Sequence, residues 1–478
     1  MLFNSIEFAI FLPIVFLLYW FVFDKNLKIQ NFFLLVVSYI FYGWWDWRFL
    51  SLIIFSSVID FFIGKKLGAE NNNKKRKLLL LISITVNLGF LGFFKYYNFF
   101  VESFVDAYTF FGSTLNIKTL KIILPVGISF YTFQTLSYSI DVYKRKLEPT
   151  NDIVAFFAFV SFFPQLVAGP IERASNLLPQ FYIKRKFDYD KSVDGLRQIL
   201  WGLFKKIVIA DNAAKYANQI FNNYSDYSGS TLLLGALLFA FQIYGDFSGY
   251  SDIAIGTARL FGFNLMQNFA FPYFSRDIAE FWRRWHISLS TWFRDYVYIP
   301  LGGSRGGLWS KIKNTFIIFI VSGFWHGGNW TFLMWGFINA VYFLPLLLLK
   351  KNRINTNTVA QGKIVPTIKE ILQMLTTFFI TTLAWVFFRA ESVSDAFKYL
   401  VSMFSSDLFS KPQIFPLNVL LLIIILVITE WIQKEKQHAL ELSQTKLPRN
   451  IRWGIYIVIV FLILWFQGEP QQFIYFQF

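Results

Sequence analysis

Long apolar segments recur along the whole chain, separated by shorter polar stretches. A helix needs about 20 mostly apolar residues to cross the hydrocarbon core of a bilayer, and shorter segments rely on tilt or on their neighbours. The pattern predicts an all-α, polytopic membrane bundle of about 11 or 12 spans within the single domain 1–478, the segment 314–349 being long enough for two passes. The candidate segments lie at 5–23, 31–44, 49–64, 78–94, 119–140, 197–213, 231–262, 314–349, 371–388, 414–433 and 451–467.

One further apolar stretch contains helix-breaking residues. Residues 152–171 include the pairs Phe163-Pro164 and Gly169-Pro170. Broken backbone is tolerated at membrane depth only where protein or water surrounds it. We therefore expect this stretch to be re-entrant and not a complete crossing.

The composition excludes a soluble protein. Of 478 residues, 55% are hydrophobic and only 15% are charged, whereas soluble domains carry about 25% charged residues. Lys and Arg number 45 against 29 Asp and Glu, which gives a formal net charge of +16. The basic residues cluster at the ends of apolar segments, as the positive-inside rule predicts. They form no separate basic domain, so the charge indicates membrane topology and not a nucleic-acid partner.

The basic loops also predict which way the chain faces. Loop 65–77 has six basic residues and one acid, and its placement in the cytoplasm puts the N-terminus outside. The stretch 276–313, with seven basic and three acidic residues, then lies inside, and we expect segment 273–313 to be interfacial. The last span carries the aromatic tail 468–478 to the outer face. The first span has no basic n-region or small-residue cleavage site, so we expect it to be retained.

Few residues in this chain can transfer a proton. There are three histidines and no cysteine, which excludes disulfides, thiolate nucleophiles and thiolate metal sites. The scattered histidines predict no metal site. His438 lies in a polar loop, where we expect a solvent-exposed side chain. His326 lies in an otherwise apolar stretch, 316–349, where an ionisable residue indicates function and burial favours the neutral imidazole.

His286 lies in a segment with the pattern of an interfacial helix. Phe281, Trp285 and Leu289 fall on one side at helical spacing, and cations occupy the other. The pattern is equally compatible with a membrane anchor and with a site. The cations of this region could bind a phosphate-bearing substrate on the cytoplasmic side; they are Arg283, Arg284, Arg294 and Arg305.

Two carboxylates interrupt another apolar segment. Asp246 and Asp252 lie within 231–262, where unpaired charges are costly, so we expect partners for them and arginine in particular. They would form a structural polar network, or they would line a polar cavity, with Asp246 binding substrate, or orient a histidine.

The region of the two histidines resembles the membrane-bound O-acyltransferase (MBOAT) family. The residues that carry the resemblance are Phe281–Gly303 and Ser322–Trp330. The similarity is strongest to the bacterial branch typified by alginate and peptidoglycan O-acetyltransferases. Further matching stretches are Met1–Ser5, Tyr39–Trp47, Phe162–Arg173 and Tyr250–Ala254.

The resemblance implies a helical bundle that encloses a funnel in the bacterial cytoplasmic membrane, surrounded by lipid. His326 corresponds to the signature histidine of the family, and His286 to the second histidine of the bacterial motif. The implied donor is a thioester, acetyl-CoA or a phosphopantetheine-linked acyl group, with no tightly bound cofactor. On this basis His326 accepts the proton of the attacking hydroxyl, and His286 positions the donor or shapes the site.

The C-terminal residues 473–478 resemble the aromatic tail of the family's acetyl exporters, whose tail tyrosine is implicated as a transient acyl acceptor. Here that residue is Tyr475; an interfacial aromatic anchor is the alternative. The acetyl group would then reach an extracytoplasmic partner transferase that O-acetylates a surface polysaccharide or peptidoglycan. Transfer of D-alanine or another acyl group from a carrier protein stays open as an alternative, and a secondary transporter as a more distant one.

Overall fold

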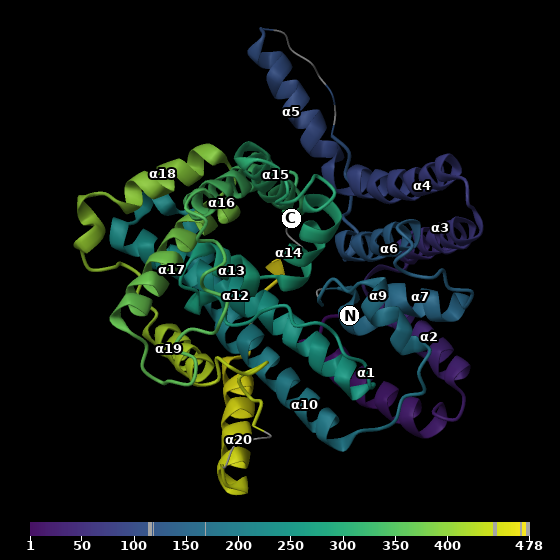
Figure 1. Cartoon of the computed structure of the whole chain (residues 1–478). Coiled ribbons are helices and arrows are strands. Elements are labelled where there is room, and N and C mark those ends of the chain that lie inside the picture. The colour runs from purple at the N-terminus through teal and green to yellow at the C-terminus, as the bar shows by residue number, and fades with distance from the viewer. Residues whose placement is uncertain (113–116, 118, 168, 443–446, 469–470, 475–478) are drawn as a thin grey trace. The chain divides into compact units, whose positions relative to one another are not determined.

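The computed structural model describes residues 1–112, 117, 119–167, 169–442, 447–468 and 471–474. Every regular element within these ranges is helical, which confirms the predicted all-α class. The chain divides into two compact units. Unit 1 comprises Met1–Gly195 and Thr257–Met266, and unit 2 comprises Leu196–Gly256 and Gln267–Phe478. Two helices, α10 and α12, contribute to both (Figure 1).

Helices of 4 to 32 residues make up most of the chain. The helices that begin in unit 1 are α1 (Ile6–Leu17), α2 (Leu27–Asp46), α3 (Leu50–Ala69), α4 (Asn73–Leu91), α5 (Tyr97–Phe110), α6 (Ile128–Tyr143), α7 (Ile153–Ser161), α8 (Phe163–Leu166), α9 (Ala174–Leu177) and α10 (Tyr189–Leu203). Unit 2 continues with α11 (Asp211–Asn222), α12 (Gly229–Leu260), α13 (Ile278–Arg284), α14 (Ile287–Phe293), α15 (Leu308–His326), α16 (Trp330–Leu348), α17 (Ile368–Arg389), α18 (Val393–Met403), α19 (Leu417–Ile432) and α20 (Arg449–Phe466).

Six helical stretches are long and apolar enough to cross a membrane, and three shorter ones are also apolar. The chain is therefore a multi-pass membrane protein. The expected segment 119–140 begins its helix only at Ile128, since Pro125 precedes it and Gly127 adopts a left-handed φ of 75°. The expected double span 314–349 does form two helices, α15 and α16, separated at 327–329.

In unit 1 a buried carboxylate joins three helices that lie side by side, α3, α4 and α6 (Figure 1). Asp60 of α3 accepts hydrogen bonds from Ser83 and Asn87 of α4 and from Ser139 of α6, with donor–acceptor distances of 2.5, 2.7 and 2.9 Å. A buried acid with three donors around it stabilises one relative position of these helices. The stretch expected to be re-entrant is broken at Phe162, between α7 and α8.

In unit 2 the helices α15 and α16 pack against each other through glycines. A Cβ atom at Gly336 would overlap the carbonyl oxygen of Phe319, and one at Gly323 would overlap that of Phe332. Small residues let the two backbones approach closely, as is typical of membrane helix pairs. This close pair forms one wall of the site described below.

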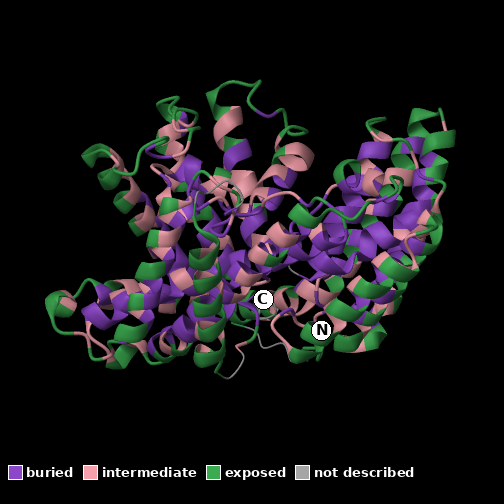
Figure 2. Cartoon of the chain, turned by 90° about the horizontal axis from the view of Figure 1, so that it is seen from below, coloured by how far each residue is buried: buried purple, intermediate pink, exposed green. Residues whose placement is uncertain are grey.

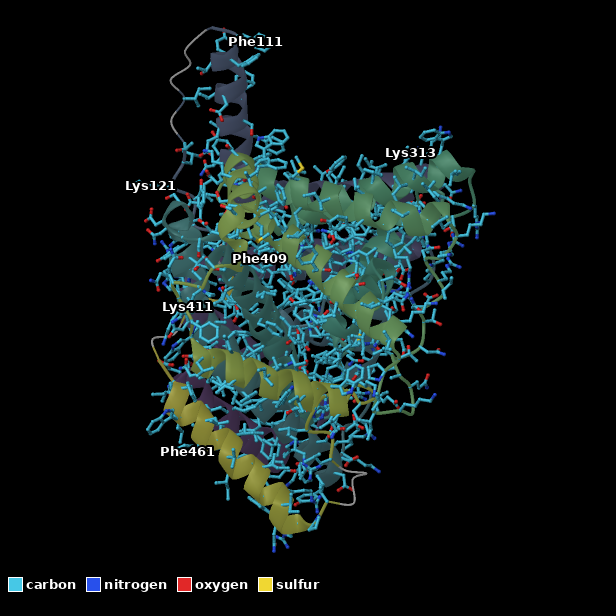
Figure 3. The ribbon with its side chains drawn as sticks, turned by 90° about the vertical axis from the view of Figure 1, so that its left-hand side faces the viewer. Phe111, Lys121, Lys313, Phe409, Lys411 and Phe461 are labelled. Atoms are coloured by element: carbon cyan, nitrogen blue, oxygen red, sulfur yellow. The ribbon has the colours of Figure 1, made fainter. Side chains whose placement is uncertain are left out.

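Apolar side chains also cover much of the outer surface. Figure 2 shows buried residues gathered in the interior and exposed residues along the outer turns. Helix α20 is the extreme case: Ile459 is its one buried residue, and Phe461 points away from the ribbon (Figure 3). Such apolar exposure is expected where the neighbouring medium is lipid.

The glycine contact between α15 and α16 generates a stability prediction. We expect Gly336→Ala to destabilise the protein by about 1–3 kcal/mol, because the added methyl group forces the helices apart. The matched control is Gly454→Ala on α20, where a Cβ would meet nothing within 4 Å; alanine there is neutral or stabilises by up to about 1 kcal/mol. Thermal unfolding of the purified proteins in one detergent measures both, and equal midpoints would contradict the packing argument.

Candidate active site

His286 links two short helices in an uncommon backbone conformation. It is the N-cap of α14, directly after α13, with φ 44° and ψ 54°. The preceding segment holds it there, because the Ile287 N–H donates to the Asn268 carbonyl (2.9 Å) and the Ala270 N–H donates to the Arg284 carbonyl (3.0 Å). A left-handed residue that is not glycine is costly and often belongs to a functional site.

The imidazole of His286 has a fixed orientation and tautomer. Its Nδ1 lies 3.1 Å from Oδ1 of Asn268, an atom that also accepts from the Ser288 hydroxyl (2.8 Å), while Nδ2 of Asn268 donates to Ser251 (3.0 Å). Since Oδ1 is the acceptor, Nδ1 carries the proton and Nε2 presents its lone pair. His286 is 1% exposed, and this burial lowers its pKa to about 3, so the ring is neutral.

His326 ends α15 and is enclosed by aromatic rings. Its own ring centroid lies 5.0, 5.2 and 5.2 Å from those of Trp325, Trp335 and Phe388, and the residue is 3% exposed. The chain turns directly after it at Gly327, where a Cβ would overlap the ring of Phe332. The helix break thus places the histidine in an apolar environment.

Both histidines line one cavity of about 230 Å³ in unit 2. Its walls come from α13, α14, α15, α16 and the loops beside them. Apolar side chains alternate with polar ones, which are Ser290, Ser304, Thr315, Ser322 and Asn352, and Arg294 and Arg353 are its cations. An apolar cavity with a few polar groups that converge on it is typical of a small-molecule site. Sequence reasoning missed Asn268, Ser290, Ser322 and Arg353, since such residues carry no distinctive spacing.

The four arginines considered as phosphate contacts occupy different environments. Arg294 lines the cavity and pairs with Asp295 at 2.7 Å. Arg283 donates to two main-chain carbonyls of the loop after α16, and Arg284 pairs with the buried Glu280 at 2.9 Å. Arg305 is exposed and does not line the cavity. The structure thus brings one of the four, Arg294, to the histidine cavity.

The ion-pair partners of Asp246, which is buried, and of Asp252, which is partly buried, are lysines, so the expectation of arginine was wrong. Lys206 lies 2.7 Å from Asp246, and Lys205 lies 2.6 Å from Asp252. The two lysines follow each other within the predicted apolar segment 197–213, in a π-helical turn at Phe204–Ala210. The presence of two charged residues inside an apolar segment was the sequence signal that could have identified these lysines as partners of the aspartates. Asp246 does not line the histidine cavity.

The tail enters unit 2 beside the site. Tyr475 lies outside the described residues, but Phe473 and Ile474 are buried, at 0% and 1% exposure. The ring of Phe473 lies 4.4 Å from that of Tyr250 and 6.2 Å from that of Phe247, and Phe247 lies 4.6 Å from His286. One aromatic ring therefore separates the described end of the tail from His286.

His438 departs from its expected exposure. It is 1% exposed, because the loop after α19 folds back onto unit 2. Gln267 donates to the Gln437 carbonyl (3.1 Å), and Lys434 donates to the Lys363 carbonyl (2.9 Å). His438 does not line the cavity of the other two histidines. Within the described residues, no group of three or more His, Cys, Asp or Glu side chains could hold a metal ion.

Comparison with known proteins places these features in a family. The MBOAT, membrane-bound O-acyltransferase family matches residues 147–388, which include both cavity histidines. The chain is 40% identical over 407 residues to the probable alginate O-acetylase AlgI of Pseudomonas aeruginosa, which covers 85% of this chain and 75% of the relative. It is 36% identical over 432 residues to the peptidoglycan O-acetyltransferase of Helicobacter pylori, covering 84% and 80%.

A more distant similarity covers about half of the chain. The teichoic acid D-alanyltransferase of Bacillus subtilis is 29% identical over 236 residues, which span 45% of this chain and 57% of that protein. The relatives are thus acyltransferases, and the resemblance first drawn from Phe281–Gly303 and Ser322–Trp330 is confirmed. The chain belongs to the membrane-bound O-acyltransferase (MBOAT) family and is an acyltransferase.

Proposed function

We propose that this enzyme takes an acetyl group from a cytoplasmic thioester, acetyl-CoA, and moves it across the bacterial cytoplasmic membrane for O-acetylation of a surface polysaccharide or peptidoglycan. The observation that carries the proposal is a cavity lined by two buried histidines, one of which is held by a hydrogen bond between its Nδ1 and Asn268. The relatives named O-acetylase and O-acetyltransferase support the choice of an acetyl group.

The reaction needs a base, and His326 is the group we assign to it. The hydroxyl oxygen of the acceptor attacks the thioester carbonyl carbon as His326 takes the hydroxyl proton. The carbon–sulfur bond then breaks, the acetyl ester forms, and His326 returns the proton to the thiolate that leaves. The aromatic surroundings of His326 favour its neutral form, which can accept a proton.

His286 has a different role in this scheme. With its Nδ1–H donating to Asn268, Nε2 is the acceptor atom of the ring. It suits a group that orients a substrate N–H or O–H, for example an amide of the pantetheine arm. Arg294 and Arg353, at the same cavity, are the cations available to donor phosphates.

The tail supplies the first acceptor in our proposal, through the hydroxyl of Tyr475. This residue directly follows the buried Ile474, and the ring of the preceding Phe473 is separated from His286 by one ring, that of Phe247. A free phenol has a pKa of about 10, so the base is needed for attack at neutral pH. The acetyl group would then pass to an extracytoplasmic partner transferase.

The first prediction tests the base. We expect His326→Gln, which keeps side-chain volume and polarity, to lower acetyl transfer by at least about 100-fold, the usual contribution of a general base. The matched control is His438→Gln, a buried histidine away from the cavity, which we expect to stay near the wild-type rate. Surface O-acetylation in cells with equal membrane levels of each protein measures the effect. A rate for His326→Gln within a few fold of wild type would refute the assignment.

The second prediction tests the tail hydroxyl. Tyr475→Phe removes one oxygen and keeps the ring, so acetyl export should be lost while the protein accumulates normally. Tyr189→Phe, at an exposed tyrosine of unit 1, is the control. Unimpaired export by Tyr475→Phe would leave only the anchor role for the tail.

The third prediction concerns the donor. Membrane vesicles with wild-type enzyme should become labelled from [acetyl-14C]acetyl-CoA and not from a carrier protein charged with labelled D-alanine. Labelling from the charged carrier protein and not from acetyl-CoA would contradict the acetyl proposal. It would favour D-alanyl transfer, the activity in the name of the Bacillus subtilis relative.

A further inference from the structure

Three buried charged side chains of unit 2 form a compact cluster. The Lys206 ammonium lies 2.7 Å from Oδ1 of Asp211 and 2.7 Å from Oδ1 of Asp246. Lys206 is 1% exposed, and its partners come from α11 and α12. We call Lys206, Asp211 and Asp246 the tail clamp, because Lys206 and Asp246 also bind the main chain of the C-terminal tail.

The clamp also binds the main chain of the tail at two points. Lys206 donates to the carbonyl of Gln471 (3.2 Å), and the N–H of Ile474 donates to Oδ2 of Asp246 (2.7 Å). An ammonium has three N–H donors. Lys206 thus has one acceptor for each donor, two carboxylates and one tail carbonyl, and the cluster is complete only with the tail in place.

The two contacts define both the position and the direction of the segment. They lie three residues apart and flank Phe473, whose ring packs against Tyr250 and Phe247 of α12. Hydrogen bonds between charged side chains and the main chain are strong, and they do not depend on which side chains the bound segment carries. The aromatic contact adds selectivity for a ring at position 473. An aromatic anchor at the membrane interface would not need hydrogen bonds between its main chain and a buried cluster of charged side chains.

We propose that Lys206, Asp211 and Asp246 form a binding site for the chain's own C-terminal segment and act as positioning residues for acyl transfer. They hold residues 471–474 inside unit 2, beside the ring that contacts His286. The consequence for transfer rests on the proposed function of Tyr475. The binding itself does not.

The absence of cysteine makes a direct test possible. Ile474→Cys introduces a unique thiol at a buried position, and Gln467→Cys introduces one at an exposed position of the same segment. In intact membranes, a polyethylene-glycol maleimide should label Cys at 467 readily and Cys at 474 at least tenfold more slowly. Equal labelling rates at the two positions would overturn the proposal.

The clamp variants complete the test. Asp246→Asn or Lys206→Met should raise the labelling rate at position 474 at least tenfold. The matched controls are Asp252→Asn and Lys205→Met, which break the neighbouring buried pair between the same two elements without touching the tail; these should leave position 474 protected. Two variants of the clamp are used so that loss of one protein in the membrane does not decide the result. Protection that persists in both, or is lost equally in the controls, would overturn the clamp.

Membranes with the clamp variants but without the introduced cysteine separate this proposal from the proposed function. Acetyl transfer is measured in the Asp246→Asn and Lys206→Met proteins that retain the native Ile474. Exposure of position 474 together with lost transfer supports both ideas. Exposure with undiminished transfer supports the clamp and contradicts the relay through Tyr475. Unchanged protection with lost transfer contradicts the clamp and leaves the relay intact.

Discussion

A charged or polar group buried in an apolar helical protein must find its partners within the chain, because neither lipid nor packed side chains can replace the water it has lost. In unit 1, Asp60 meets this requirement with three neutral donors from two other helices. In unit 2, Asp252 and Asp246 meet it with lysines, and Glu430 accepts from the hydroxyl of Tyr244 at 2.8 Å. Each cluster fixes one relative position of helices whose apolar faces alone would allow several.

The candidate site differs from these clusters, because its buried polar side chains are histidines and not carboxylates. His286 and His326 are surrounded chiefly by aromatic rings, and one neutral amide fixes the ring of His286. Burial in apolar surroundings favours the neutral imidazole, which can serve as a proton acceptor. The lysine–aspartate pairs do not line this cavity, and the charged side chains that do line it are Arg294 and Arg353.

The helical class, the membrane character and the two-helix nature of 314–349 could be predicted from apolar length alone, because that signal is long and simple. The family could be predicted from the dense match around both histidines. The partner of Asp246 could not, since Lys206 lies 40 residues earlier in the chain, in a different helical element, and no spacing rule connects the two. The burial of His438 was missed because its loop is polar in composition. The loop nevertheless packs against the rest of unit 2 through hydrogen bonds to main-chain carbonyls, which a polar composition does not predict. Asn268 was missed for a similar reason: its role depends on a turn 18 residues later.

The left-handed backbone at His286 gives the site a second property. Such a conformation costs roughly 1–2 kcal/mol in a residue with a side chain, and here two main-chain hydrogen bonds to segment 268–270 sustain it. The backbone of His286 and segment 268–270 are therefore coupled, because the same pair of main-chain hydrogen bonds that supports the left-handed conformation also sets the direction in which this cavity histidine points.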